Sequence, residues 1–267
     1  MPAYLDSILA AHRAAAAADT RDVEAAVEAA VEQAERGGAT RSFADAISAA
    51  STRYGMAVIS EIKRRSPSKG DLDPDLDPAT VAVEYEAGGA ACLSVLTERQ
   101  FFGGLPDDLR AARAACSLPV LRKDFTVSAL DVCDARAMGA DAVLLIAAAL
   151  TDQELSSFLQ LADRCSLAAL VEVHDETELR RALDAGAALV GVNQRDLRTF
   201  EVDRQRALSL GAAIPAGVLA VAESGIRDVG DVARLAEAGF QAVLVGETLV
   251  RSADRRAAVA ELLGVRL

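Results

Sequence analysis

From residue 56 onward the chain repeats one pattern, a short apolar run of β-forming residues followed by a helix-like segment. Several runs follow the same lead-in, an alanine-rich helix closed by glycine, as in EAGGAACLSV, AMGADAVLLI, DAGAALVGV and EAGFQAVLV. Eight runs occur: AVISEI (57–62), CLSVL (92–96), VLRKDF (120–125), AVLLIA (142–147), AALVEV (168–173), LVGVN (189–193), LAVAES (219–224) and AVLVGE (242–247).

These runs are almost continuously apolar, which is typical of parallel strands buried on both faces. Eight successive strand–helix units predict an α/β protein of the closed (β/α)8 type, a TIM barrel. An open doubly wound sheet is the alternative, but its G-x-G-x-x-G turn is missing after the first strand, where RRSPSKG stands. Residues 1–55 carry only helical patterns, so we expect one domain over 1–267 in which 1–55 form a helical extension packed on the barrel.

Composition narrows the class of function. The net charge of -12 opposes a general nucleic-acid or anionic-lipid surface, although a local anion site remains possible. The four cysteines form no C-x-x-C pair and there are only two histidines, so no zinc-type cluster is expected and the thiols suit a reducing compartment.

Nothing in the sequence indicates a membrane or secretory protein. The N-terminus has no basic segment followed by an apolar stretch, and the longest apolar uncharged run, between Asp141 and Asp152, is too short to span a bilayer. We expect a cytoplasmic protein.

Lysine is scarce: of 28 basic residues only Lys63, Lys69 and Lys123 are lysines. Either these sites need an ammonium group, or an arginine-favouring codon bias left three exceptions by chance. Composition alone does not separate the two explanations.

Polar residues end six of the eight runs, and in such a barrel the chemistry belongs to the carboxyl ends of the strands. They are Glu61 and Lys63, Lys123 and Asp124, Glu172, Asn193, Glu223 and Ser224, and Gly246 and Glu247. Charges converging on one barrel mouth must be paired or functional, because isolated buried charge is costly.

Structural explanations stay open for each residue taken singly. Glu61, Lys63, Lys123 and Glu172 could form an ion-pair plug, and Asn193 could be a turn residue. We expect His174 to be a satisfied rim residue, and the Phe101–Phe102 pair, followed by two glycines, to form a pocket wall rather than core.

The loops after the last two strands read AESGIRD and VGETLV. Gly225 and Gly246 would let backbone N–H groups approach a phosphate near a helix N-terminus, with Ser66 closing the site. A glycine at a strand–helix turn also has a purely steric explanation.

At this point the chain resembles the indole-3-glycerol-phosphate synthase family. The similarity lies in EIKRRSPSKG, LTERQFFGG, LRKDF, LIAAAL, LVEVH, GVNQRDL, AESGI and LVGETL, from about residue 43 to 250. Leu105 departs from the family's usual serine, and Gln194 lies at a variable place.

The resemblance implies conversion of 1-(2-carboxyphenylamino)-1-deoxyribulose 5-phosphate to indole-3-glycerol phosphate, a lyase step of tryptophan biosynthesis without cofactor or metal. Lys123 would be the general acid and Glu172 the general base. Lys63 would bind the substrate carboxylate and share the role of general acid in dehydration. Glu61 and Asn193 would orient these groups. Ser66, Gly225, Gly246 and Glu247 would bind the phosphate, Phe102 and Phe125 the aromatic ring, and Glu223, Ser224 and Arg195 the sugar and the lysines.

Two other functions remain. A related phosphate-binding barrel isomerase would need a cysteine or aspartate acid–base pair. At the corresponding strand ends this chain has Glu61, Lys63 and Asn193. A barrel that only binds a phosphorylated ligand or a protein partner would need no intact set of four charged residues.

Overall fold

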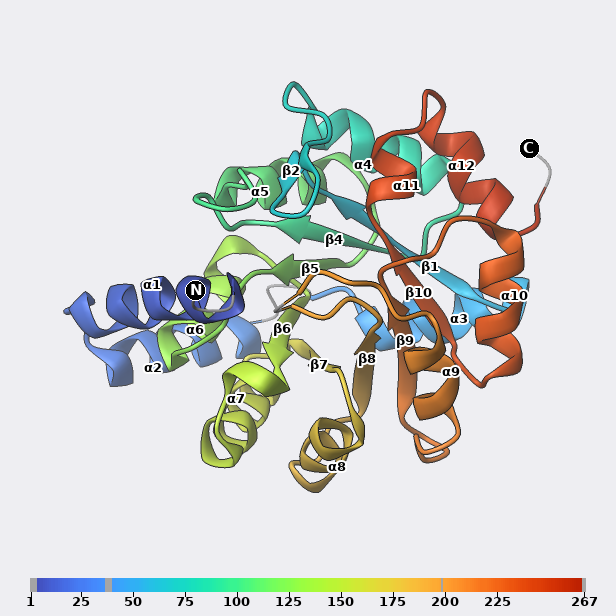
Figure 1. Ribbon diagram of the computed structural model, residues 1–267. Coiled ribbons are helices and arrows are strands. Elements are labelled where there is room, and N and C mark those ends of the chain that lie inside the picture. Colours follow the sequence, from blue (N-terminus) through green and yellow to red (C-terminus); the bar gives the residue numbers. More distant parts are fainter. Residues whose placement is uncertain (1–3, 37–39, 198, 266–267) are drawn as a thin grey trace.

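The computed structural model describes residues 4–36, 40–197 and 199–265. Within these ranges eight parallel strands close into a barrel (Figure 1), in the order β1-β10-β9-β8-β7-β6-β5-β4. The strands are β1 (Ala57–Ile62), β4 (Cys92–Leu96), β5 (Val120–Lys123), β6 (Ala142–Ile146), β7 (Ala168–Val173), β8 (Leu189–Asn193), β9 (Leu219–Glu223) and β10 (Ala242–Val245). The (β/α)8 prediction is confirmed, and the open sheet is excluded because β1 pairs with both β4 and β10.

Four strands end earlier than the apolar pattern predicts, since the next residues leave the extended conformation. The run predicted to reach 147 stops at Ile146, because Ala147 begins a 3-10 turn, η1 (Ala147–Ala149). Ser224 has a left-handed φ of 67° and ends β9 at Glu223. Gly246 caps the short helix α11, so β10 ends at Val245, and β5 ends at Lys123 instead of Phe125.

Helices cover the outside of the barrel. The glycine lead-ins behave as predicted: Gly89, Gly139, Gly186 and Gly239 all have positive φ, and the strand follows within three residues. The helices are α4 (Pro78–Ala87), α5 (Pro106–Ala115), α6 (Ala129–Met138), α7 (Asp152–Arg164), α8 (Glu176–Asp184), α9 (Gln205–Gly211), α10 (Val229–Glu237), α11 (Glu247–Val250) and α12 (Arg255–Leu262). A small antiparallel pair, β2 (Arg65–Ser66) and β3 (Gly70–Asp71), follows β1.

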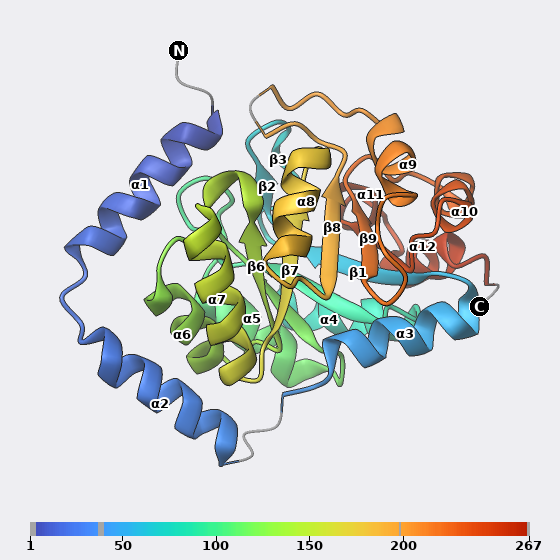
Figure 2. The same ribbon diagram turned by 90° about the horizontal axis from the view of Figure 1, so that it is seen from below.

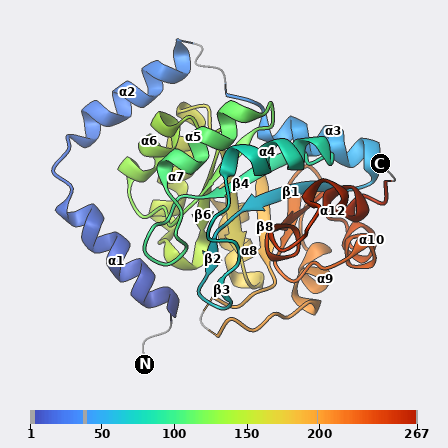
Figure 3. The same cartoon turned by 90° about the horizontal axis from the view of Figure 1, so that it is seen from above.

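The segment before the barrel forms α1 (Tyr4–Ala18), α2 (Val23–Glu35) and α3 (Phe43–Tyr54). Figures 2 and 3 show α1 and α2 as an arc beside α6 and α7. Phe43 and Ile47 of α3 are fully buried in the same apolar cluster as Ala57 and Cys92, where their strands begin. The third helix therefore closes the amino-terminal end of the barrel.

The first helix lies at the opposite end. Leu5 and Ile8 are buried in the interior cluster that includes Phe125, just after β5. Arg13 donates to the carbonyl of Ala149 at 2.9 Å and to Glu154 at 2.8 Å, in the segment between β6 and α7. No helix in the described ranges is long and apolar enough to cross a membrane.

Candidate active site at the carboxyl ends of the strands

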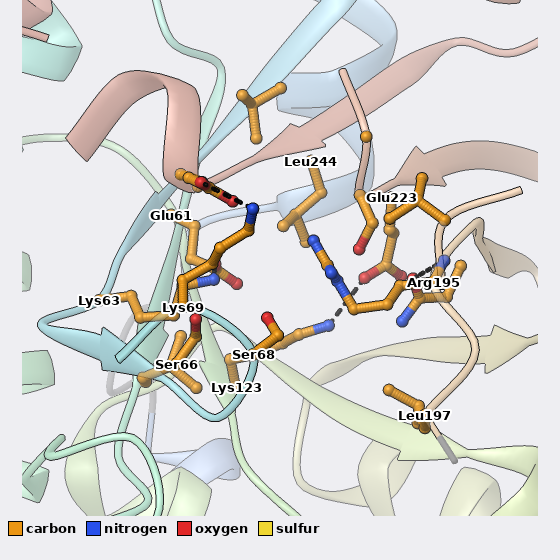
Figure 4. A pocket seen from close by; sticks show the side chains of 18 of the residues that line it. Glu61, Lys63, Ser66, Ser68, Lys69, Lys123, Arg195, Leu197, Glu223 and Leu244 are labelled. Atoms are coloured by element: carbon orange, nitrogen blue, oxygen red, sulfur yellow. Dashed lines mark hydrogen bonds and ion pairs between the residues drawn. The ribbon is translucent and has the colours of Figure 1, made fainter. Parts of the chain in front are cut away.

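A cavity of about 700 Å³ opens at the carboxyl ends of the barrel strands (Figure 4). Inward-facing strand positions and the loops that follow them form its walls, as expected for a barrel of this type. Every residue assigned above to catalysis or substrate binding lines it: Glu61, Lys63, Ser66, Phe102, Lys123, Phe125, Glu172, Asn193, Arg195, Glu223, Ser224, Gly225, Gly246 and Glu247. The structure thus brings together residues spread over 187 positions of sequence, from Glu61 to Glu247.

Lys123 lies at the centre of this cavity, between two carboxylates from other strands. Its Nζ donates to Oε2 of Glu172 at 2.9 Å and to Oε2 of Glu223 at 2.7 Å. All three side chains are largely buried. Three strands, β5, β7 and β9, therefore meet in one charge-assisted network.

Burial and charge act in opposite directions on this network. Burial raises the pKa of Glu172, but the nearby charges of Lys123 and His174 outweigh it and leave that pKa below its ordinary value. Burial raises the pKa of Glu223 to about 7, with Lys123 lowering it only in part. Burial alone would lower the pKa of Lys123, yet Glu172 and Glu223 raise it above the ordinary lysine value. The free site thus favours an ammonium beside one ionised carboxylate.

A second ion pair joins Lys63 to Glu61, both from the β1 end. A Cβ on Gly246 would lie 2.2 Å from Oε1 of Glu61 and 3.1 Å from Nζ of Lys63. The missing side chain at Gly246 therefore makes the room that this pair occupies.

Gly191 makes room for the side chain of Glu223 in the same way, although no sequence pattern pointed to this glycine. A Cβ on Gly191 of β8 would lie 2.1 Å from Oε1 of Glu223 on the neighbouring strand β9. Two barrel glycines thus accommodate two of the site's carboxylates.

Asn193 combines the two roles considered for it. Its Oδ1 accepts the backbone N–H of Arg195 at 3.0 Å, which is turn chemistry. Its amide also lies beside Glu172 and helps to lower the pKa of that carboxyl. Gln194, which follows, donates from Nε2 to the carbonyl of Ser224 at 2.7 Å and so fixes the left-handed turn before Gly225.

Two phenylalanines form the apolar wall of the cavity. The rings of Phe102 and Phe125 lie 6.2 Å apart at 40°. Phe101 packs against the interior cluster instead of lining the cavity, so only one member of the expected pair forms the wall. Glu98, which the sequence did not reveal, accepts the backbone N–H groups of Phe101 and Phe102 at 2.6 and 3.0 Å and fixes this loop.

The opposite side of the cavity is basic and rich in glycine. Ser66 of β2, Gly225 with a φ of 74°, and Gly246 at the start of α11 all border it. Lys69 lies 3.9 Å from Oε1 of Glu247, and Arg251 lies 3.7 Å from the same atom. Glu247 therefore has two cations within 4 Å, and the strand pattern did not predict the contribution of Arg251.

All three lysines of the chain line this one cavity. Chance retention in an arginine-rich chain would scatter them over the surface, so their positions favour a requirement for ammonium groups. Among the described residues no group of three or more histidine, cysteine, aspartate or glutamate side chains is arranged to hold a metal ion.

Two solved structures with less than 20% sequence identity to this chain share its barrel fold. A 3-hexulose-6-phosphate synthase structure covers 78% of this chain and 99% of its own, with a TM-score of 0.64 and 18% identity. A thiamine phosphate pyrophosphorylase from Pyrococcus furiosus covers 79% of this chain and 95% of its own, with a TM-score of 0.60 and 17% identity.

Sequence comparison is more specific. The family model described as indole-3-glycerol phosphate synthase matches residues 5–262. The indole-3-glycerol phosphate synthase of Polaromonas sp. is 51% identical over 234 residues, covering 88% of this chain and 89% of its own length. That of Mycolicibacterium vanbaalenii is 49% identical over 259 residues, covering 97% and 93%. By cavity, charged network and sequence, the chain belongs to the indole-3-glycerol phosphate synthase family.

Proposed function

We propose that this chain converts 1-(2-carboxyphenylamino)-1-deoxyribulose 5-phosphate into indole-3-glycerol phosphate, with loss of carbon dioxide and water, in tryptophan biosynthesis. The observation that carries the proposal is the placement of Lys123 between Glu172 and Glu223 in a cavity with an aromatic wall on one side and a basic, glycine-rich side on the other.

The first chemical step forms a carbon–carbon bond from the aromatic ring to the ketose carbonyl, whose oxygen must receive a proton. Lys123 is the general acid in this proposal. Its two carboxylate neighbours keep it protonated in the free site, so a proton is present when the substrate binds.

Carbon dioxide then leaves from the ring carbon that formed the bond. Lys63 binds the substrate carboxylate before this step, with Glu61 holding its ammonium in place. Loss of the carboxylate returns the bonding electrons to the ring system.

Dehydration completes the indole. The new hydroxyl leaves with a proton from a lysine acid, while a base removes a proton from the intermediate. Glu172 suits the role of base because its pKa lies below the ordinary glutamate value, so it is ionised at neutral pH. Asn193 orients it, and Glu223, Ser224 and Arg195 hold the sugar and the lysines.

The substrate's two ends fit the two sides of the cavity. Phe102 and Phe125 take the anthranilate ring by apolar contact. Ser66, Gly225, Gly246 and the backbone of Glu247 take the phosphate, with Lys69 and Arg251 adding positive charge at this side. We place the activity in the cytoplasm, since all four cysteines are free and buried, as suits a reducing compartment.

The direct test is an ultraviolet assay for indole formation from the carboxyphenylamino substrate. Glu172→Gln should keep the fold and lower kcat by about 10²–10⁴-fold, because an amide cannot accept the proton. Glu176→Gln, an exposed site on α8, is the matched control and should leave kcat unchanged.

Two outcomes would count against the proposal. Tight binding of the substrate without product would favour a barrel that only binds its ligand. Near-parent turnover by Glu172→Gln, with an unchanged circular dichroism spectrum, would make Glu172 a structural residue.

A further inference from the structure

His174 lies immediately after β7, two residues beyond Glu172, and outside the residues that line the cavity. Only 12% of its side chain is exposed, and its Nε2 lies 3.6 Å from Oε1 of Glu172. Within the described residues, both of these buried atoms lack a hydrogen-bond partner. The imidazole therefore faces the carboxylate oxygen that Lys123 leaves free.

The other ring nitrogen is anchored from α8. Nδ1 of His174 lies 3.1 Å from Oε2 of Glu178, and the same oxygen accepts the backbone N–H of His174 at 2.8 Å. Asp175 caps α8 by accepting the N–H of Glu178 at 2.8 Å, which fixes Glu178 in the first turn. A carboxylate beside Nδ1 favours a proton on that nitrogen and turns Nε2 toward Glu172.

We propose that His174 is a positioning residue for Glu172: the row Glu178–His174–Glu172 orients the carboxylate and favours its ionised form during turnover. The idea rests on the proposed role of Glu172 as base. It assigns a function to the histidine that we expected only to be a satisfied rim residue.

Charged and polar groups from several elements face the row. Glu172 faces Lys123 from β5 and Asn193 from β8, and Glu223 of β9 shares Lys123 with it. His174 faces Glu172 and Glu178, with Arg206 of α9 nearby. Burial lowers the pKa of His174, but the hydrogen bond to Glu178 and the charge of Glu172 raise it above the ordinary histidine value. The positive form thus persists to higher pH than in an ordinary histidine and supports a negative Glu172.

The coupling can be measured without any turnover. The chain has only two histidines, so an NMR titration of His12 and His174 can be assigned with a single His12→Asn variant. Glu172→Gln and Glu178→Gln should each lower the pKa of His174 by about one unit, because each removes a facing negative charge. Glu176→Gln is the control of equal charge change on the same helix and should leave it unmoved. An unmoved pKa in Glu172→Gln would overturn the proposal.

Kinetics then test whether the coupling serves catalysis. In His174→Asn an amide stands near the position of Nδ1, and the group that faces Glu172 is lost. In His174→Gln the longer side chain places an amide near the position of Nε2. His174→Asn should lower kcat roughly 3–10-fold, leave KM within about twofold, and shift the acidic limb of the kcat profile to higher pH. His174→Gln should recover part of kcat.

The two proposals fail in distinguishable ways. A parent-like acidic limb in folded His174→Asn would overturn the role of His174 while indole formation stands. A moved NMR titration in a chain that forms no indole would refute the proposed function and leave the coupling of His174 to Glu172 intact.

Discussion

Lys123 has two carboxylate oxygens within 3 Å, and both come from side chains that are nearly inaccessible to water. Arginine supplies 25 of the 28 basic residues of this chain, so a lysine at this position calls for a chemical reason. The planar guanidinium of arginine stays protonated at any working pH and spreads its donors over a wide fork, whereas the ammonium of lysine is compact and can give up a proton.

Lys123→Arg should therefore fold normally and lose most activity, by about 100-fold or more in kcat. Steady-state kinetics with circular dichroism would measure both. Product formation at near the parent rate would assign Lys123 to ion pairing instead of proton transfer.

Residue positions on strands were predictable because alternate residues share one face of a strand. His174 lies two positions beyond Glu172 but in the bend after β7, where this rule does not apply, so only a rim position and not its contact with Glu172 was predictable. Gly191 could not be found this way. Its contact is with Glu223 on a neighbouring strand, and only the register of β8 against β9 brings the two together.

At the scale of elements, the junction of β10 with α11 affects two parts of the site. Gly246 borders the expected phosphate site and also makes room for the Glu61–Lys63 pair. Substitution there should disturb both, since an added Cβ would lie 2.2 Å from Oε1 of Glu61 and would force that carboxylate to move away from its present position beside Lys63.

Gly246→Ala is expected to raise KM and lower kcat together, and to weaken inhibition by inorganic phosphate by about threefold or more. Gly191→Ala is the matched variant, because its Cβ would crowd Glu223 and lies at no phosphate contact. It should lower kcat with little change in phosphate inhibition. Equal phosphate inhibition in parent and Gly246→Ala would place the phosphate elsewhere.

The ends of the strands show where the local sequence pattern no longer predicts the backbone conformation. The sequence pattern extends β9 to 224 and β10 to 247, where Ser224 and the Gly246–Glu247 pair follow the apolar residues directly. The strands end sooner because the backbone turns at Ser224 and Gly246 to begin the loops that form the site. The helices before residue 55 were predictable as helices, but not the closure of the amino-terminal end of the barrel by α3, which depends on contacts of Phe43 and Ile47.

For the molecule as a whole, the buried network links acidity to folding stability. Burial raises the pKa of Glu223 from an ordinary 4.5 to about 7. The folded state thus favours the neutral acid, and this contribution to stability is complete below pH 4.5 and is lost as pH rises through 7. Glu172 has its pKa lowered, so its contribution changes only below its ordinary value and does not enter this window.

The glutamine side chain of Glu223→Gln is neutral at every pH. The variant should therefore not show this loss of stability as the pH rises. Between pH 5 and pH 8 the free energy of unfolding of the parent should fall relative to the variant by up to about 3 kcal/mol. His174, whose pKa is raised by its carboxylate neighbours against the effect of burial, is present in both proteins, so the comparison removes its contribution. Urea unfolding at the two pH values measures the difference, and parallel pH dependences would contradict it.

The gathering of all three lysines around one cavity also determines how the chain responds to amine-directed reagents. Lys69 exposes 48% of its side chain, against 15% for Lys63 and 14% for Lys123. Of the three lysines, all within the described ranges, Lys69 is therefore the one that a bulky acylating dye reaches readily. Without any engineered cysteine, such a dye would sit at the cavity rim and report occupancy of the barrel mouth by a change in fluorescence.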